Sequence, residues 1–382
     1  MPTPFRYVTP TSTEAATGQV AEVYRQLADD FGLARMPLFM TLSPAPDVLA
    51  ATWAMVRESL VAGEASRTDK EVVAVAVSLA NRCPFCVDAH TMLLHATGAH
   101  ELAETVARGG TPADPRQARL LAWAMATRTP EETGHAEPPF PAGLAAEHIG
   151  TALAFHFVNR MASALLTDDL LPGGVQRWRL VRRAGGRAVA RTTRRRQEPG
   201  RSLPLLRMPL LRVPMGPDPS DSSGAWEGSG AWEGPASSDG SSFWAGPAPA
   251  WTASSSSGTA IAAAFAALRA AAGSGGALLG ADARQVVEAQ VREWDGAHPP
   301  LAGGWPSDQT ALLPEADRPA ARLALLAAVA PYRIADTDVA AWRSVTRTAT
   351  PDGDADLVRL LAYGAITAVN HVEAGLNRPA RA

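Results

Sequence analysis

The chain has 382 residues, of which 46% are hydrophobic and 19% are charged, so most of it can form a buried core. Its 35 basic and 38 acidic residues nearly cancel, which excludes binding of nucleic acid or membranes through overall charge. Two cysteines exclude a disulfide-rich scaffold, and the lack of a secretory leader or a membrane-length apolar run predicts a cytoplasmic protein.

The first 165 residues have the pattern of amphipathic helices. Apolar residues from Val20 to Phe31 repeat at helical spacing, with Thr13 as the predicted N-cap and Gly32 as the stop. No alternating strand pattern or hairpin dipeptide separates the apolar stripes, so this half is predicted to be all-α. Further helices are expected at about 48–60, 70–81, 84–97, 116–127 and 149–166.

The middle of the chain has a different composition. Residues 177–212 hold twelve arginines against one acidic residue, and residues 214–258 contain 26 Pro, Gly or Ser in 45. Such a sequence buries too little apolar surface to offset its chain entropy. We therefore expect a largely disordered linker over 185–258. Binding of nucleic acid by the arginine run is disfavoured, because no binding-domain pattern accompanies it.

The last part of the chain again has helical patterns, and its residues 259–382 are predicted to form a second all-α unit after a first domain at 1–184. The segment 159–165 resembles 370–376, which suggests that the second unit is a cysteine-free, degenerate copy of the first. Chance similarity between two alanine-rich helices is the alternative. The predicted helices are 259–272, 282–294, 317–329, 336–346 and 354–376.

Both cysteines lie in one short segment, Cys83-Pro-Phe-Cys86-Val-Asp-Ala-His90. Pro84 suits the first turn of a helix, which makes Cys83 the N-cap and predicts that Cys83, Cys86 and His90 share one face. A thiol at a helix N-terminus has a lowered pKa. His90 can relay a proton and Glu71, on the preceding helix, can orient the imidazole, which is the arrangement of an activated nucleophile.

Three other interpretations of these residues stay open at this point. Glu71 could cap its own helix in the box Thr68-x-x-Glu71. The two cysteines could bind zinc together with His90 and His95, although structural zinc sites usually draw ligands from two separated segments. The cysteines could also be inert core residues.

The spacing Glu-x11-Cys-x2-Cys-x3-His, carried by Glu71, Cys83, Cys86 and His90, resembles the motif of the AhpD-like alkylhydroperoxidases in the carboxymuconolactone decarboxylase superfamily. The resemblance covers about residues 20–165, weakens in the second half and does not extend to the linker. It implies an AhpD-like helical fold and a cysteine-based peroxidase that reduces alkyl hydroperoxides in antioxidant defence.

The resemblance also implies a role for each site residue. Cys86 would be the peroxidatic thiolate and Cys83 the resolving thiol, with Glu71 and His90 relaying the proton. An external dithiol or a lipoyl-bearing protein would reduce the disulfide, so that no cofactor or metal is required. A homo-oligomer without nucleic-acid or membrane partners is expected. Phe85 departs from members with a second histidine at this position, which predicts a shorter relay and slower turnover.

Two other functions are compatible with the same thiols. A protein disulfide reductase or redox relay would react slowly with peroxide and exchange quickly with protein disulfides. A redox-sensing or partner-binding module would be oxidised without turnover, and its partner would bind the linker segment.

Overall fold

The computed structural model describes residues 3–129, 138–169, 174–175, 178–208, 248–300, 304–346 and 352–377. These residues are helical, with two isolated bridges and no longer strand among them, so the predicted all-α class is confirmed. The helices of the first half are α1 (Gly18–Phe31), α2 (Pro37–Thr41), α3 (Pro46–Val56), α4 (Arg67–Ala80), α5 (Pro84–Thr97), α6 (His100–Ala107), α7 (Pro115–Ala126) and α9 (Ala145–Leu165).

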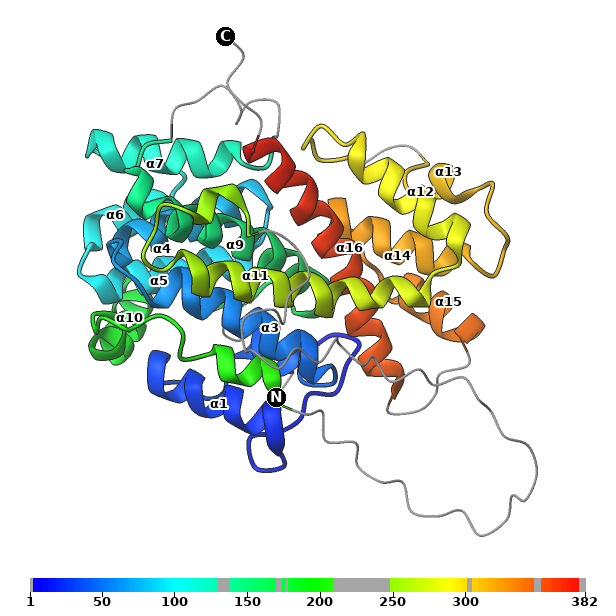
Figure 1. Cartoon of the computed structure of the whole chain (residues 1–382), viewed down its shortest axis with the longest axis horizontal. Helices are drawn as coiled ribbons and strands as arrows, with labels where there is room; N and C mark the ends of the chain where they lie inside the picture. Colours follow the sequence, from blue (N-terminus) through cyan, green and yellow to red (C-terminus); the bar gives the residue numbers. More distant parts are fainter. Residues whose placement is uncertain are drawn as a thin grey trace.

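The second half lies beside the first, and Figure 1 shows α16 between the two groups of helices and α11 lying across both. Helix α3 packs on α11 and α9 packs on α16, so that one hydrophobic cluster contains residues of both halves. The remaining helices are α10 (Arg179–Thr193), α11 (Gly258–Gly273), α12 (Ala281–Arg292), α13 (Ser307–Thr310), α14 (Arg318–Val329), α15 (Asp336–Thr346) and α16 (Asp352–Leu376).

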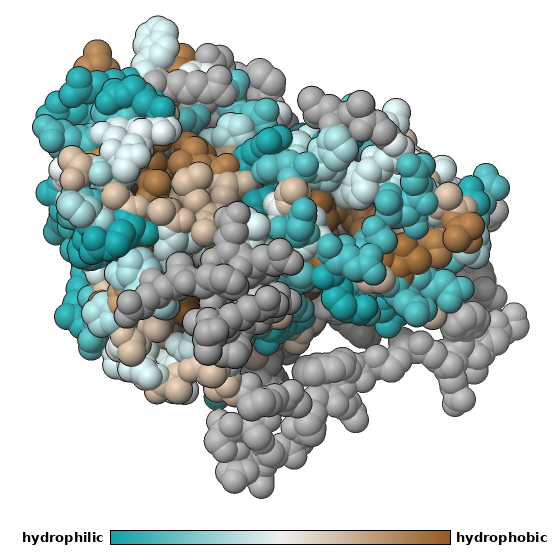
Figure 2. Space-filling model, turned by 90° about the horizontal axis from the view of Figure 1, so that it is seen from above, coloured by the Kyte–Doolittle hydropathy of each residue, from teal (hydrophilic) through white to brown (hydrophobic). Residues whose placement is uncertain are grey.

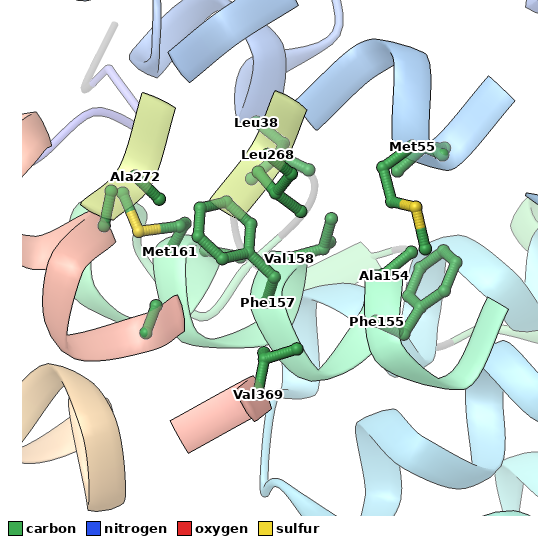
Figure 3. Packing of buried hydrophobic residues seen from close by; sticks show 14 of the residues in the cluster. Leu38, Met55, Ala154, Phe155, Phe157, Val158, Met161, Leu268, Ala272 and Val369 are labelled. Atoms are coloured by element: carbon green, nitrogen blue, oxygen red, sulfur yellow. The ribbon is translucent and has the colours of Figure 1, made fainter. Parts of the chain in front are cut away.

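Helix α9 is the centre of the molecule, because every residue from Ala146 to Leu165 is buried. A helix that is enclosed on all sides needs apolar residues around its whole circumference. Figure 3 shows its Phe155, Val158 and Met161 among residues of α3, α11 and α16. This helix forms the wall against which α4 and α5 pack, and it thereby positions the cysteine segment.

The helix boundaries follow the predicted breakers, with one correction. Gly32 and Gly98 end α1 and α5 in the left-handed conformation, at φ 76° and 99°, where glycine has no steric penalty. Helix α1, however, begins at Gly18 with Thr17 as its N-cap, so the predicted capping role of Thr13 is wrong. Thr13 instead accepts a hydrogen bond from Arg35.

Part of the predicted linker is folded. Helix α10 packs along α5, where Gly186 comes so close to His95 and Ala96 that no side chain fits between the two helices. The Arg182 guanidinium binds the Glu104 carboxylate at 2.9 Å. Composition was a poor guide here because Gly185 and Gly186 pack against α5, while Arg187 and Arg191 stay exposed.

The other end of the predicted linker is folded as well. Trp251 is buried, and its indole N–H donates to the Glu373 carboxylate of α16 at 3.0 Å. The disorder predicted for 185–258 is therefore wrong for 185–208 and 248–258. Residues 209–247, with the other three tryptophans of this segment, lie outside the described residues.

Helix α11 with the turn that follows it, Gly258–Leu278, is long and apolar enough by composition to cross a membrane. The expectation that no apolar run reaches the length needed to span a membrane is therefore wrong for this segment. In the structure its apolar residues, including Phe265 and Leu268, pack against α3 and α16 within the core.

Most of the large hydrophobic side chains among the described residues are buried. Figure 2 shows two areas where hydrophobic residues gather, one over each half, with hydrophilic residues over most of the rest. The large hydrophobic side chains that are exposed are Leu33, Met125, Trp178, Leu180, Leu312 and Val345.

Docking of α10 predicts how the arginine-rich segment responds to trypsin. In Gly186→Ala the new Cβ would lie 2.7 Å from His95 Cβ, which overpacks the helix contact by about 1–3 kcal/mol. We expect cleavage after Arg187 and Arg191, located by mass spectrometry, to be about tenfold faster than in the wild type. Gly273→Ala is the control, because nothing lies within 4 Å of its Cβ. Equal cleavage in all three proteins would contradict the docking of α10.

Candidate active site

The segment that joins α4 to α5 places the two cysteines. Arg82 adopts a left-handed conformation, at φ 53°, and reverses the chain. The Cys83 amide then donates to the Ser78 carbonyl at 3.0 Å, and Pro84 takes the first position of α5. Cys83 is the N-cap as predicted, and Cys86 lies one turn into the helix. Both are reduced and buried, with 1% and 3% of their surface exposed.

The polar groups at this helix start act differently on the two thiols. Burial acts to raise the pKa of Cys83, but the Cys86 thiol, the Ser163 hydroxyl and the Cys86 amide outweigh it, so the pKa is lowered. Burial raises the pKa of Cys86 well above its ordinary value, and the adjacent Cys83 adds to the effect. Burial therefore disfavours the thiolate form of Cys86.

The candidate base, His90, lies on α5. His90 Nδ1 lies 2.7 Å from Glu71 Oε2, and the ring packs edge-on against Phe155 with 4.4 Å between the centroids. Because the Glu71 carboxylate accepts the proton on Nδ1, neutral His90 has its free lone pair on Nε2. His90 and Cys86 line the same cavity. The structure thus brings together Glu71, His90 and Cys86 as predicted.

Arg67 is a second partner of the Glu71 carboxylate. Its role was not predicted from the sequence. Its Nε donates to Glu71 Oε1 at 2.8 Å, and the guanidinium lies over the Phe31 ring. Burial acts to raise the pKa of Glu71, but Arg67 and His90 outweigh it, so the pKa is lowered and the carboxylate stays ionised. The four-residue spacing of Arg67 and Glu71 on one helix was the available signal.

Two of the alternative interpretations of the site do not hold. Helix α4 begins at Arg67 with Ser66 as its N-cap, and the Glu71 carboxylate binds Arg67 and His90, so the capping-box interpretation of Glu71 is wrong. His95, the proposed fourth zinc ligand, instead bonds to Glu104 at 2.9 Å and to His100 at 3.0 Å. Among the described residues, no group of three or more His, Cys, Asp or Glu is arranged to hold a metal.

The cavity beside Cys86 is apolar and has a volume of about 160 Å³. A dry cavity of about this size can hold a benzene-sized molecule. The exposed side chains of Leu33 and Arg35 mark its rim. Cys86 and His90 are its reactive groups, and the remaining wall is mainly hydrophobic, including Phe31, Leu38, Phe39, Leu60, Phe85, Phe155 and Val189.

Comparisons with known proteins show which family the chain resembles. The model of the carboxymuconolactone decarboxylase family matches residues 46–126, which span α3 to α7 and contain both cysteines. The chain is 38% identical over 370 residues to the alkyl hydroperoxide reductase Rv2159c of Mycobacterium tuberculosis. That match covers 96% of this chain and 93% of the relative. No solved structure matches the chain.

The chain belongs to the carboxymuconolactone decarboxylase family and has the all-α fold of that family. Its long match to the mycobacterial reductase places it with the AhpD-like proteins, as predicted. The match extends far beyond residues 46–126, so the relative shares the second half as well.

The buried carboxylate gives the fold a defined pH dependence. Because the pKa of Glu71 is lowered from 4.5 on folding, its ion pairs stabilise the protein above that pH, and the stabilisation is lost as pH falls through the lowered value. Glu71→Gln should lower the free energy of unfolding at pH 7 by about 3 kcal/mol, and the loss should shrink below pH 4.5.

Urea unfolding at pH 7 and at lower pH measures this effect. Glu101→Gln, at an exposed position on α6, is the control and should change little. A Glu71→Gln protein as stable as the control at pH 7 would show that the ion pairs contribute nothing to the fold.

Proposed function

We propose that this enzyme reduces alkyl hydroperoxides through a dithiol–disulfide cycle of Cys83 and Cys86. The observation that carries the proposal is that Cys86 and the Glu71-oriented His90 line one apolar cavity. Transfer of an alkyl group from water to such an apolar wall is favourable. The hydroperoxide end of the same molecule would then lie beside a thiol and a base. The alkyl hydroperoxide reductase activity in the relative's name supports the same reaction.

The first half of the cycle oxidises Cys86. His90 Nε2 takes the thiol proton, and the thiolate attacks the terminal oxygen of the hydroperoxide. The O–O bond breaks, Cys86 becomes a sulfenic acid, and the leaving alkoxide takes the proton back from His90 to become an alcohol. The Glu71 carboxylate stabilises the imidazolium that forms between these steps.

The second half closes the disulfide. The Cys83 thiolate, favoured by its lowered pKa, attacks the sulfenic sulfur of Cys86. An S–S bond forms and the hydroxyl group leaves as water after protonation. An external dithiol then returns both cysteines to the reduced state. Phe85 forms part of the cavity wall where some relatives carry a histidine, so His90 has to carry the proton transfer alone.

The arrangement of the helices also supports the proposal that residues 259–382 are a degenerate copy of the first half. The helix that precedes the turn with or without cysteines packs on the last long helix in each half, α4 on α9 and α14 on α16. In the second half Pro331–Arg333 joins α14 to α15 without a cysteine, so this copy would have a structural role only.

The cysteine and histidine roles can be separated by single variants. With one equivalent of cumene hydroperoxide, Cys83→Ser should accumulate a sulfenic acid at Cys86, whereas Cys86→Ser should keep its remaining thiol. His90→Gln should slow thiol oxidation on the order of a hundredfold, because it removes the base. Stopped-flow thiol titration measures each rate.

His371→Gln is the matched control, because His371 lies in α16 and bonds to the Trp294 carbonyl. Thiols that survive the peroxide in the wild type would overturn the proposed function. Equal oxidation rates in His90→Gln and His371→Gln would overturn the role of His90.

A further inference from the structure

The two thiols of the pair line two different cavities. Cys86 faces the apolar cavity, whereas Cys83 borders a second cavity of about 470 Å³. No residue belongs to both. Helical spacing explains the separation, because the second cavity takes Cys83, Pro84, Val87 and Asp88 from one face of α5. The apolar cavity takes residues such as Cys86 and His90 from another face.

The second cavity is lined by charged and polar groups. Arg82, Arg108 and Arg182 reach it from three different elements, together with Asp88 and Ser78. Arg82 is exposed, and 70% of the Arg108 side chain is exposed. Arg182 is held by Glu104. A polar or ionised reactant loses little hydration here, but it would lose most of it in the apolar cavity, at a large free-energy cost.

We propose that the cavity beside Cys83 is the entrance for the reductant, a small polar dithiol that carries negative charge and attacks Cys83 Sγ. This inference rests on the proposed disulfide between Cys83 and Cys86. The oxidant and the reductant would then reach the same disulfide from opposite sides of α5. The arginines would attract the thiolate and the other anionic groups of the dithiol. The peroxide would occupy the apolar cavity.

The reduction consists of two successive thiol–disulfide exchanges. The dithiol's thiolate attacks Cys83 Sγ, the Cys83–Cys86 bond breaks, and Cys86 leaves as a thiolate that takes up a proton. The dithiol's second thiolate then attacks its own sulfur in the mixed disulfide. Cys83 leaves as a thiolate, and the dithiol is oxidised to its disulfide while the protein gains two electrons. The lowered pKa of Cys83 makes it a good leaving group in this second exchange.

Two half-buried alanines offer a matched pair of blocking variants. Ala107 lines the polar cavity and Ala89 lines the apolar one. In the full-length protein the disulfide is formed with diamide, so that the test does not depend on peroxide. Its reduction is followed with dimercaptosuccinate, an anionic dithiol, and with dithiothreitol, a neutral one.

We expect Ala107→Trp to slow reduction by dimercaptosuccinate about tenfold and to leave oxidation by cumene hydroperoxide unchanged. Ala89→Trp should instead slow oxidation and leave reduction unchanged.

The double variant Arg82→Glu/Arg108→Glu, which changes only exposed side chains, tests the charge. It should lower the rate with dimercaptosuccinate relative to dithiothreitol about tenfold, whereas Arg292→Glu, on the exposed face of α12, should not.

The inference is overturned if Ala89→Trp slows reduction and Ala107→Trp does not. It is equally overturned if the double arginine variant has the wild-type ratio of rates for the two dithiols. Failure of the peroxidase proposal looks different. The thiols then resist peroxide in every protein, while the diamide-formed disulfide still reports which cavity admits the dithiol.

Discussion

The buried carboxylate of Glu71 is the constraint on which the site depends. An ionised carboxylate without solvent is costly unless charged or hydrogen-bonding groups surround it. Arg67 supplies one partner from the same helix and His90 supplies the other from α5. The requirement to satisfy Glu71 therefore fixes the orientation of α5 against α4. It also fixes which imidazole nitrogen is left without the Glu71 hydrogen bond, and Phe155 of α9 holds the ring from the side.

The same physical principle connects other distant parts of the chain. Lys70, the only lysine in the sequence, is buried and binds Glu147 of α9 at 2.9 Å, and burial lowers its pKa to about 8. Lys70 and Glu71 are adjacent on α4 and point to different helices, so one turn of α4 is tied to both α9 and α5. A fully buried Arg57 binds Asp30 and Glu58 in the same way. These pairs specify which helices meet, while the apolar core around α9 supplies most of the stabilisation.

The local features of the site could be predicted from the sequence, because they depend on residues within a few turns of one another. The N-cap position of Cys83 follows from Pro84, and the shared face of Cys86 and His90 follows from helical spacing. The folding of α10 could not be predicted, because its arginine content resembles that of a disordered segment and its stability comes from α5. The single face predicted for Cys83, Cys86 and His90 is wrong for Cys83, which lines a cavity on a different face of α5 from the other two. The lining of that cavity could not be predicted, because Arg108 reaches it from the end of α6 and Arg182 from α10 through long-range packing.

The most direct test of this account is the intact mass of the reduced protein before and after one equivalent of cumene hydroperoxide. The account predicts that the mass falls by two hydrogen atoms and that a proteolytic digest yields Cys83 and Cys86 in one disulfide-linked peptide. A mass that is unchanged, or that increases by oxygen atoms without a disulfide, would contradict it.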